Sequence, residues 1–90
     1  MTSNYAVARA WANGYIASSN RMWTDGSNLY SYALKIGLRY AGENLLINYM
    51  GRNMYSMTTS HHVSLAKQVA DRVIDPDSFE FDELRRQGIC

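Results

Sequence analysis

The residues MYSMTTSHHVSLAKQVADRVI, positions 54–74, contain the clearest helical pattern in the chain. Apolar residues recur there at steps of three and four, which is the spacing of one face of an amphipathic helix. The members of this stripe are Val63, Ala66, Val69, Ala70 and Val73, widened by Leu65. The stretch therefore predicts the main helix of the fold, and the rest of the chain is expected to pack against its apolar face.

The ends of this helix are marked by residues with known preferences. Thr58, Thr59 and Ser60 can each accept a hydrogen bond from the free N–H groups of a first helical turn. Pro76 pushes Asp75 out of the helical region of backbone conformation. We therefore place the helix at residues 59–74, and we expect residues 54–56 before it to be extended.

Residues 34–40 give the clearest strand pattern, because apolar and polar side chains alternate. A second strand is expected at residues 45–50, and the Asp25–Gly26 pair favours a hairpin turn between two shorter strands. The pattern predicts an α+β fold, in which a small antiparallel β-sheet of three to four strands is covered by one amphipathic helix. The helix is expected to pack on the sheet face that carries Leu34, Ile36, Leu38, Leu45 and Ile47.

The two ends of the chain are less clear. Residues 3–13 are rich in alanine, which favours a helix, but large residues alternate with small ones, which favours a strand. We predict a strand there. Residues 77–90 form a short acidic C-terminal tail or helix, in which Asp77 and Glu80 resemble a capping box. We expect one domain over residues 1–90, with a core at 1–76 and the acidic tail at 77–90.

Composition excludes several classes of protein. Cys90 is the only cysteine, so neither an internal disulfide nor a cysteine-based zinc site can form. No apolar run approaches the roughly 20 residues that cross a bilayer. We expect a cytoplasmic protein. We also expect no cofactor. Residues 1–70 carry six basic and two acidic side chains, whereas residues 71–90 carry three basic and six acidic ones. This asymmetry is compatible with a charged partner, and also with a tail that folds back on the body.

Several short segments resemble a family of small uncharacterised proteins found largely in bacteriophage genomes. They are Leu29-Tyr30-Ser31-Tyr32, Ile36-Gly37, Ala41-Gly42 and Tyr55-Ser56-Met57-Thr58-Thr59-Ser60-His61-His62. The residues at 8–12 and 24–26 are similar to the upstream part of that family, so the resemblance covers residues 8 to 73. It implies a phage accessory protein that acts inside an infected bacterium, and it brings no catalytic residue with it.

Two functions are consistent with these features. The first is an accessory protein that binds and inhibits a host protein, including a defence effector of the restriction or CRISPR type. The alternative is a small nucleic-acid-binding protein, because basic and aromatic residues lie on the predicted strands and turns. These residues are Arg21, Trp23, Tyr30, Tyr32, Lys35, Arg39 and Arg52. An enzyme is not expected, since the sequence has neither a P-loop nor a nucleophile elbow.

The alternation predicts a surface for a partner, or for a second copy of the chain in a homodimer. The side chains out of phase with the predicted core would line an open sheet face, and their mixture of basic and apolar groups suits an interface. They are Lys35, Arg39, Leu46, Asn48 and Met50, with Arg52 at the edge. An ordinary solvated sheet face would carry similar residues.

The start of the predicted helix is a second candidate, for an anion. Free N–H groups and hydroxyls at a helix N-terminus can hold a phosphate, although plain capping uses the same residues. The candidates are Thr58, Thr59, Ser60, His61 and His62. The two histidines are adjacent and point about 100° apart on a helix, so no metal site is expected.

Overall fold

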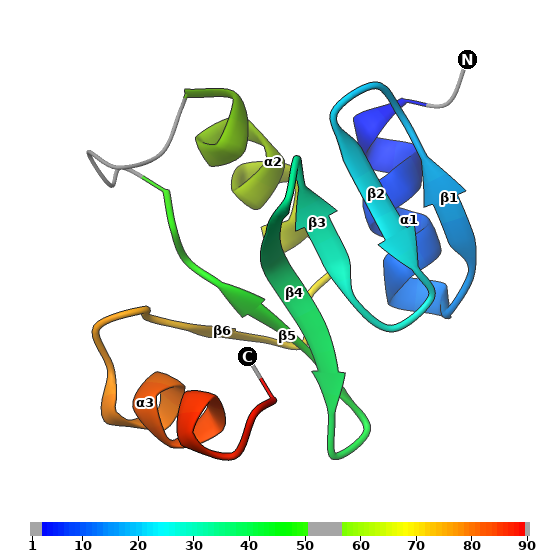
Figure 1. The fold of residues 1–90 in the computed structure, drawn as a ribbon. Helices are drawn as coiled ribbons and strands as arrows, with labels where there is room; N and C mark the ends of the chain where they lie inside the picture. Colours follow the sequence, from blue (N-terminus) through cyan, green and yellow to red (C-terminus); the bar gives the residue numbers. More distant parts are fainter. Residues whose placement is uncertain (1–2, 51–56, 90) are drawn as a thin grey trace.

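The computed structural model describes residues 3–50 and 57–89, and within them it contains a six-stranded sheet and three helices (Figure 1). In chain order the elements are α1 (Asn4–Asn13), β1 (Ile16–Ser18), β2 (Met22–Asp25), β3 (Leu29–Ser31), β4 (Leu34–Tyr40), β5 (Glu43–Ile47), α2 (Met57–Lys67), β6 (Arg72–Ile74) and α3 (Phe79–Arg86). The predicted α+β class is confirmed, but the sheet is larger than predicted.

The strands lie in the sheet in their order along the chain. β1 to β5 form an antiparallel meander, whereas β6 runs parallel to β5. A parallel neighbour needs a crossover connection, and the segment that contains α2 provides it. The sheet is therefore mixed rather than purely antiparallel.

The sheet has helices on both faces. α1 and α2 lie side by side and bury Val7, Trp11, Val63 and Ala66 against one face. α3 lies on the other face, over the half of the sheet that contains β5 and β6 (Figure 1). The side chain of Arg72 identifies the face that α3 covers, because it forms an ion pair with Glu80 of α3. Leu45 is paired with Arg72, so its side chain points to the same face. One covering helix was thus an underestimate.

Trp11 and Gly37 form the closest contact between α1 and the sheet. The Trp11 side chain is fully buried, and its indole Nε1 donates a hydrogen bond to the Ser27 carbonyl at 2.9 Å. A Cβ atom added to Gly37 would lie 2.8 Å from Cζ2 of Trp11. Glycine at this position allows the helix to approach the sheet so closely.

A β-bulge in β4 changes which side chains share a face. Leu29 is paired with Gly37, but the next residue, Tyr30, is paired with Lys35, so Ile36 is an extra residue in the strand. Simple alternation therefore fails across the bulge. Leu38 is paired with Leu45, which is in turn paired with Arg72 on the side of α3. Leu38 therefore faces α3, although it was predicted to pack under the helix of residues 59–74.

Residues 3–13 form a helix, so the predicted strand is wrong. Ser3 caps α1 by accepting a hydrogen bond from the Ala6 N–H, and Gly14 ends it with a left-handed φ of 82°. The buried residues Val7, Ala8 and Trp11 follow helical spacing. The alternation of large and small residues in this segment had no structural meaning.

The helix predicted at residues 59–74 is too long. α2 ends at Lys67, and residues 72–74 form β6. The Asp71 N–H donates to the Asn44 carbonyl at 2.9 Å, and the Asn44 N–H donates to the Asp71 carboxylate at 2.8 Å. These bonds align the chain with β5. Val69 is only partly buried and Val73 is 40% exposed, so neither belongs to the predicted buried stripe. The predicted extended segment at residues 54–56 lies outside the described residues.

The acidic tail forms α3 and packs on the sheet. Its cap is Ser78, which accepts a hydrogen bond from the Phe81 N–H, rather than Asp77. Phe81 and Leu84 are buried, and Phe81 lies edge-on to Tyr49 with ring centroids 6.4 Å apart. The tail thus supplies core residues as well as charge.

Candidate functional site

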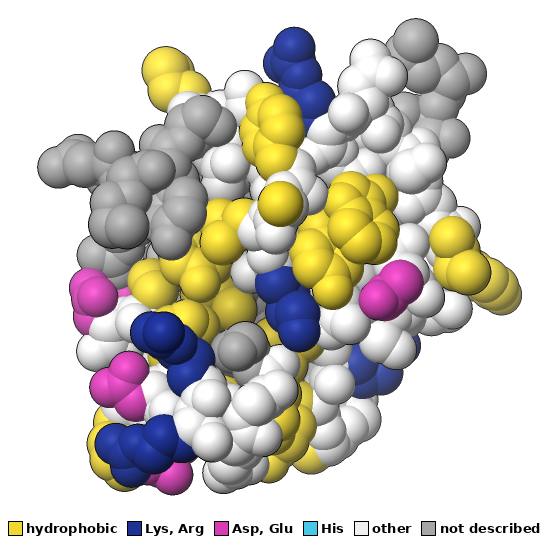
Figure 2. Space-filling model, viewed as in Figure 1, with side chains coloured by type: hydrophobic (Ala, Val, Ile, Leu, Met, Phe, Trp, Pro, Cys, Tyr) yellow, Lys and Arg dark blue, Asp and Glu magenta, His cyan; other side chains and the backbone are white. Residues whose placement is uncertain are grey.

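One half of the sheet carries large side chains on a face that no described helix covers. The register aligns Ser18 with Trp23, Trp23 with Tyr30, and Tyr30 with Lys35, so these four side chains point the same way. Ile16 lies two residues before Ser18 and shares their face. We call Ile16, Ser18, Trp23, Tyr30 and Lys35 the aromatic face. Figure 2 shows an apolar patch over β2 and β3, with a basic side chain beside it on β4.

Trp23 and Tyr30 form the centre of the aromatic face. Their rings are stacked, with centroids 4.0 Å apart and planes within 10°. Trp23 nevertheless remains 40% exposed. Stacking across neighbouring strands restricts the rotation of both side chains, so the two rings present a rigid apolar surface to solvent.

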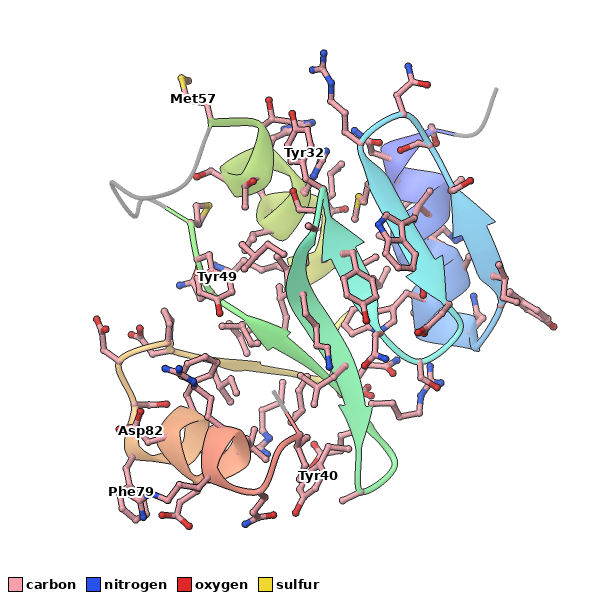
Figure 3. The ribbon with its side chains drawn as sticks, in the orientation of Figure 1. Tyr32, Tyr40, Tyr49, Met57, Phe79 and Asp82 are labelled. Carbon is pink, nitrogen blue, oxygen red and sulfur yellow. The ribbon has the colours of Figure 1, made fainter. Side chains whose placement is uncertain are left out.

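Tyr32 lies at the tip of the hairpin between β3 and β4, next to the aromatic face (Figure 3). Its backbone has a φ of 56°, in the left-handed region that favours glycine. Two hydrogen bonds hold it there. Its N–H donates to the Arg21 carbonyl at 2.8 Å, and its carbonyl accepts from Trp23 Nε1 at 3.0 Å. The side chain is 47% exposed, and its ring lies tilted against the buried His62 of α2, with ring centroids 6.3 Å apart.

The charges around the aromatic face are mixed. Lys35 lies on the face itself, and its Nζ is 3.4 Å from the Ile89 carbonyl. Asp25 lies two residues after Trp23 on the same strand face. Hydrogen bonds from the Asn28 and Ser27 N–H groups lower the pKa of Asp25, so this carboxylate stays ionised. The face therefore lacks the uniform positive charge of a phosphate-binding groove.

A buried polar cluster lies on the opposite face, between β3 and α2. The Ser31 hydroxyl is 2.7 Å from His62 Nδ1 and 3.1 Å from the Thr59 hydroxyl. His62 is fully buried, and its Nε2 has no hydrogen-bond partner. Burial, with smaller contributions from the charges of His61 and Arg21, lowers the pKa of His62, so its neutral form is favoured. This serine–histidine pair is sealed from solvent and holds α2 on the sheet.

The residues predicted to line an open face do not share one. Leu46 is fully buried and is paired with Gly37, on the face covered by α1. Arg39 points to the same side, where its guanidinium donates to the Trp11 carbonyl at 2.7 Å and to the Gly26 carbonyl at 2.8 Å. The prediction of one open face was wrong because it did not include the bulge in β4 or the helix α1.

The other members of that predicted surface are scattered. Met50 is 39% exposed near the end of β5, and its N–H donates to the Asn48 side chain. Arg52 lies outside the described residues. Lys35 alone of the predicted set belongs to the aromatic face, so any shared role for these side chains stays a prediction.

The candidate anion-binding residues are divided between the two sides of α2. Thr59 and His62 point into the core, whereas His61 is exposed. Because α2 begins at Met57, Thr58, Thr59 and Ser60 lie within its first turn instead of preceding it. The structure does not bring the five side chains together at one point.

The aromatic face could be anticipated only in part. The hairpin signal at Asp25–Gly26 places Trp23 and Tyr30 on neighbouring strands, and both were candidates for nucleic-acid binding. No pattern in the sequence indicated the left-handed backbone of Tyr32. The exposure of Ile16 was not predicted either, because the strand predicted before it is a helix.

In residues 3–50 and 57–89, no group of three histidine, cysteine or acidic side chains is placed to hold a metal ion. None of the helices in these ranges is long and apolar enough to cross a membrane. Comparisons of the chain with protein-family models, with curated proteins and with solved structures give no match.

Proposed function

We propose that this chain is an accessory protein of bacteriophage type that binds a host protein through the aromatic face and so modulates or inhibits it. The exposed Trp23–Tyr30 stack at the centre of this face carries the proposal. Beside it, the half-exposed Tyr32 has a backbone conformation that glycine would adopt with less strain, and the Trp23 indole bonds to its carbonyl. Strain of this kind is typical of functional sites.

The composition of the aromatic face also supports a protein partner. Tryptophan and tyrosine are enriched among the residues that dominate binding energy in protein interfaces. The Trp23–Tyr30 stack is rigid, so little side-chain entropy is lost on binding. The resemblance to phage proteins supports a host protein in the bacterial cytoplasm as the partner, and a defence effector of the restriction or CRISPR type is one class of such proteins.

Nucleic-acid binding is the second candidate, supported by the exposed rings and by Lys35. Bases stack on the flat faces of aromatic side chains. Here Trp23 and Tyr30 each give one ring face to the other, and Asp25 adds a negative charge nearby. These two features favour a protein partner.

The test is a pull-down from a bacterial host lysate, with and without nuclease, followed by affinity measurements on the purified partner. We expect a protein to be retained after nuclease treatment. Trp23→Ala and Tyr32→Gly should each weaken its binding at least tenfold, since residues central to an interface contribute about 2 kcal/mol or more. Phe79→Ala is the control, because Phe79 is exposed on α3, away from the aromatic face.

Two outcomes would contradict the proposal. In one, both variants bind the partner as tightly as the wild type while remaining folded. In the other, nuclease abolishes capture and the affinity for nucleic acid falls steeply with salt, which would favour the second candidate.

A further inference from the structure

β1 is an edge strand whose outer backbone groups can be identified from the hydrogen bonds of its neighbours. The Ser19 N–H donates to the Met22 carbonyl at 2.8 Å, which closes the β1–β2 hairpin. Bonded and non-bonded pairs alternate along an antiparallel ladder. Ala17 is therefore bonded to Thr24, whereas the N–H and C=O groups of Ile16 and Ser18 point away from β2.

Among the described residues, short length is the one protection that this edge strand has. Proteins guard such edges with very short strands, lysine, proline, bulges or a covering segment, and β1 has three residues. Residues 10–20 contain no charged residue and no proline. Ile16 is 81% exposed and Tyr15 is 68% exposed. β1 thus offers outward-pointing backbone groups, with no partner among the described residues, beside exposed apolar side chains.

We propose that a second copy of the chain pairs with this edge, β1 against β1 in antiparallel register, with Ala17 on the twofold axis. Ile16 of each copy then lies opposite Ser18 of the other, and the two outward residues of each strand exchange backbone hydrogen bonds. Two six-stranded sheets join into one continuous sheet. This proposal does not depend on the proposed function.

The side chains along the edge suit such a pairing. Ile16 and Ser18 lie on one face, so each large side chain meets a small one. Ala17 lies at the axis, where the opposing strands form a non-bonded pair and side chains come closest. The contacting residues are neutral, so no like charges meet across the twofold axis. Charge repulsion therefore does not oppose the pairing of the two copies.

α1 enlarges the contact beyond the strand. α1 packs over β1 and β2, on the face away from Ile16. With strands about 4.8 Å apart, the twofold axis would place the two copies of α1 about 10 Å apart, near the 8–10 Å spacing of packed helices. The short strand still limits the buried area, so we expect a weak, concentration-dependent dimer rather than an obligate one.

Analytical ultracentrifugation of the full chain tests this pairing, under reducing conditions so that Cys90 cannot crosslink the copies. The wild type should shift from monomer to dimer as its concentration rises from micromolar to millimolar. Ile16→Lys and Ser18→Lys each place a charge on the edge, and we expect both to weaken the dimer at least tenfold. Phe79→Lys, an equally exposed apolar position on α3, is the matched control and should dimerise as the wild type does.

Amide exchange supplies a second readout that reports the edge directly. The amides of Ile16 and Ser18 should become protected at high concentration in the wild type, and should stay unprotected in Ser18→Lys. A wild type that is monomeric at millimolar concentration would overturn the proposal. So would a dimer that both lysine variants leave intact, since that dimer would use another surface. Tyr32→Gly should dimerise as the wild type does, because Tyr32 lies in the β3–β4 turn and not at the β1 edge. A loss of partner binding in this variant can therefore be distinguished from a loss of dimerisation.

Discussion

The left-handed backbone of Tyr32 lowers the free energy of unfolding by an amount that can be measured. An L-residue in this conformation loses about 1–2 kcal/mol relative to glycine. We expect Tyr32→Gly to be more stable than Tyr32→Ala by about 1 kcal/mol, because both variants lose the ring and only glycine relieves the backbone. Urea denaturation of the two variants measures this difference. Equal stabilities would show that the hairpin turn is not strained at Tyr32.

His62 makes stability depend on pH. Its folded pKa lies below the usual 6.5, so the folded state holds the neutral ring. As pH falls below about 6.5, the unfolded chain takes up a proton first and the free energy of unfolding decreases, by about 1.4 kcal/mol for each unit that separates the two pKa values. The loss ends below the folded pKa, where both states are protonated.

Thermal melts between neutral and mildly acidic pH measure this effect. His62→Gln should remove this part of the pH dependence, because glutamine does not titrate. His61→Gln is the matched control: His61 is exposed one position earlier, and the slope should remain largely intact. A slope that survives in His62→Gln would assign the dependence to other groups.

Among the elements, α1 depends on β4 and β5 for its C-terminal end. The last carbonyls of a helix have no partner within it. Arg39 donates to the Trp11 carbonyl at 2.7 Å, and the Asn44 side chain donates to the Ala12 carbonyl at 3.1 Å. Arg39 Nε also donates to Asn44 Oδ1 at 3.0 Å, so one network joins the helix end to two strands.

We expect Arg39→Lys to destabilise the fold by about 2–3 kcal/mol, although it preserves the charge. A lysine ammonium cannot reach carbonyl groups of α1 and of the β2–β3 turn together with Asn44. The midpoint of urea unfolding measures the loss, and Arg9→Lys on the exposed side of α1 should leave it unchanged. An unchanged midpoint for Arg39→Lys would fit a solvated arginine on an open face instead.

How far the elements follow from sequence depends on how local their causes are. The hairpin at Asp25–Gly26 and the strand at residues 34–40 have local signals and were predicted. The bulge at Ile36 was not, because one extra residue leaves no mark in a pattern of apolar and polar residues. β6 was read as helix, since the pairing of Asp71 with Asn44 joins residues far apart in the chain. The aromatic face was only partly predicted, because the bulge at Ile36 and the helix before β1 were both missed.

At the scale of the whole molecule, the sheet needs α3 as well as α1 and α2. Phe81 is 6% exposed on the face opposite α1. Phe81→Ala should cost about 3–5 kcal/mol, the usual effect of emptying a buried phenylalanine site. Phe79→Ala on the same helix should change stability by less than about 0.5 kcal/mol, because that side chain is exposed. Chemical denaturation compares the two, and similar small losses would mean that α3 is dispensable.

The order of the strands also has a consequence for how the chain folds. β2 to β5 each pair with the strand before them through a short turn, so these contacts close small loops with a low entropic cost. β6 can pair with β5 only after the chain has passed through α2, which is a more distant contact. We infer a folding nucleus in the meander, with β6 and α3 joining after the transition state. Newly synthesised chains would then hold a formed meander while their last residues are still emerging from the ribosome.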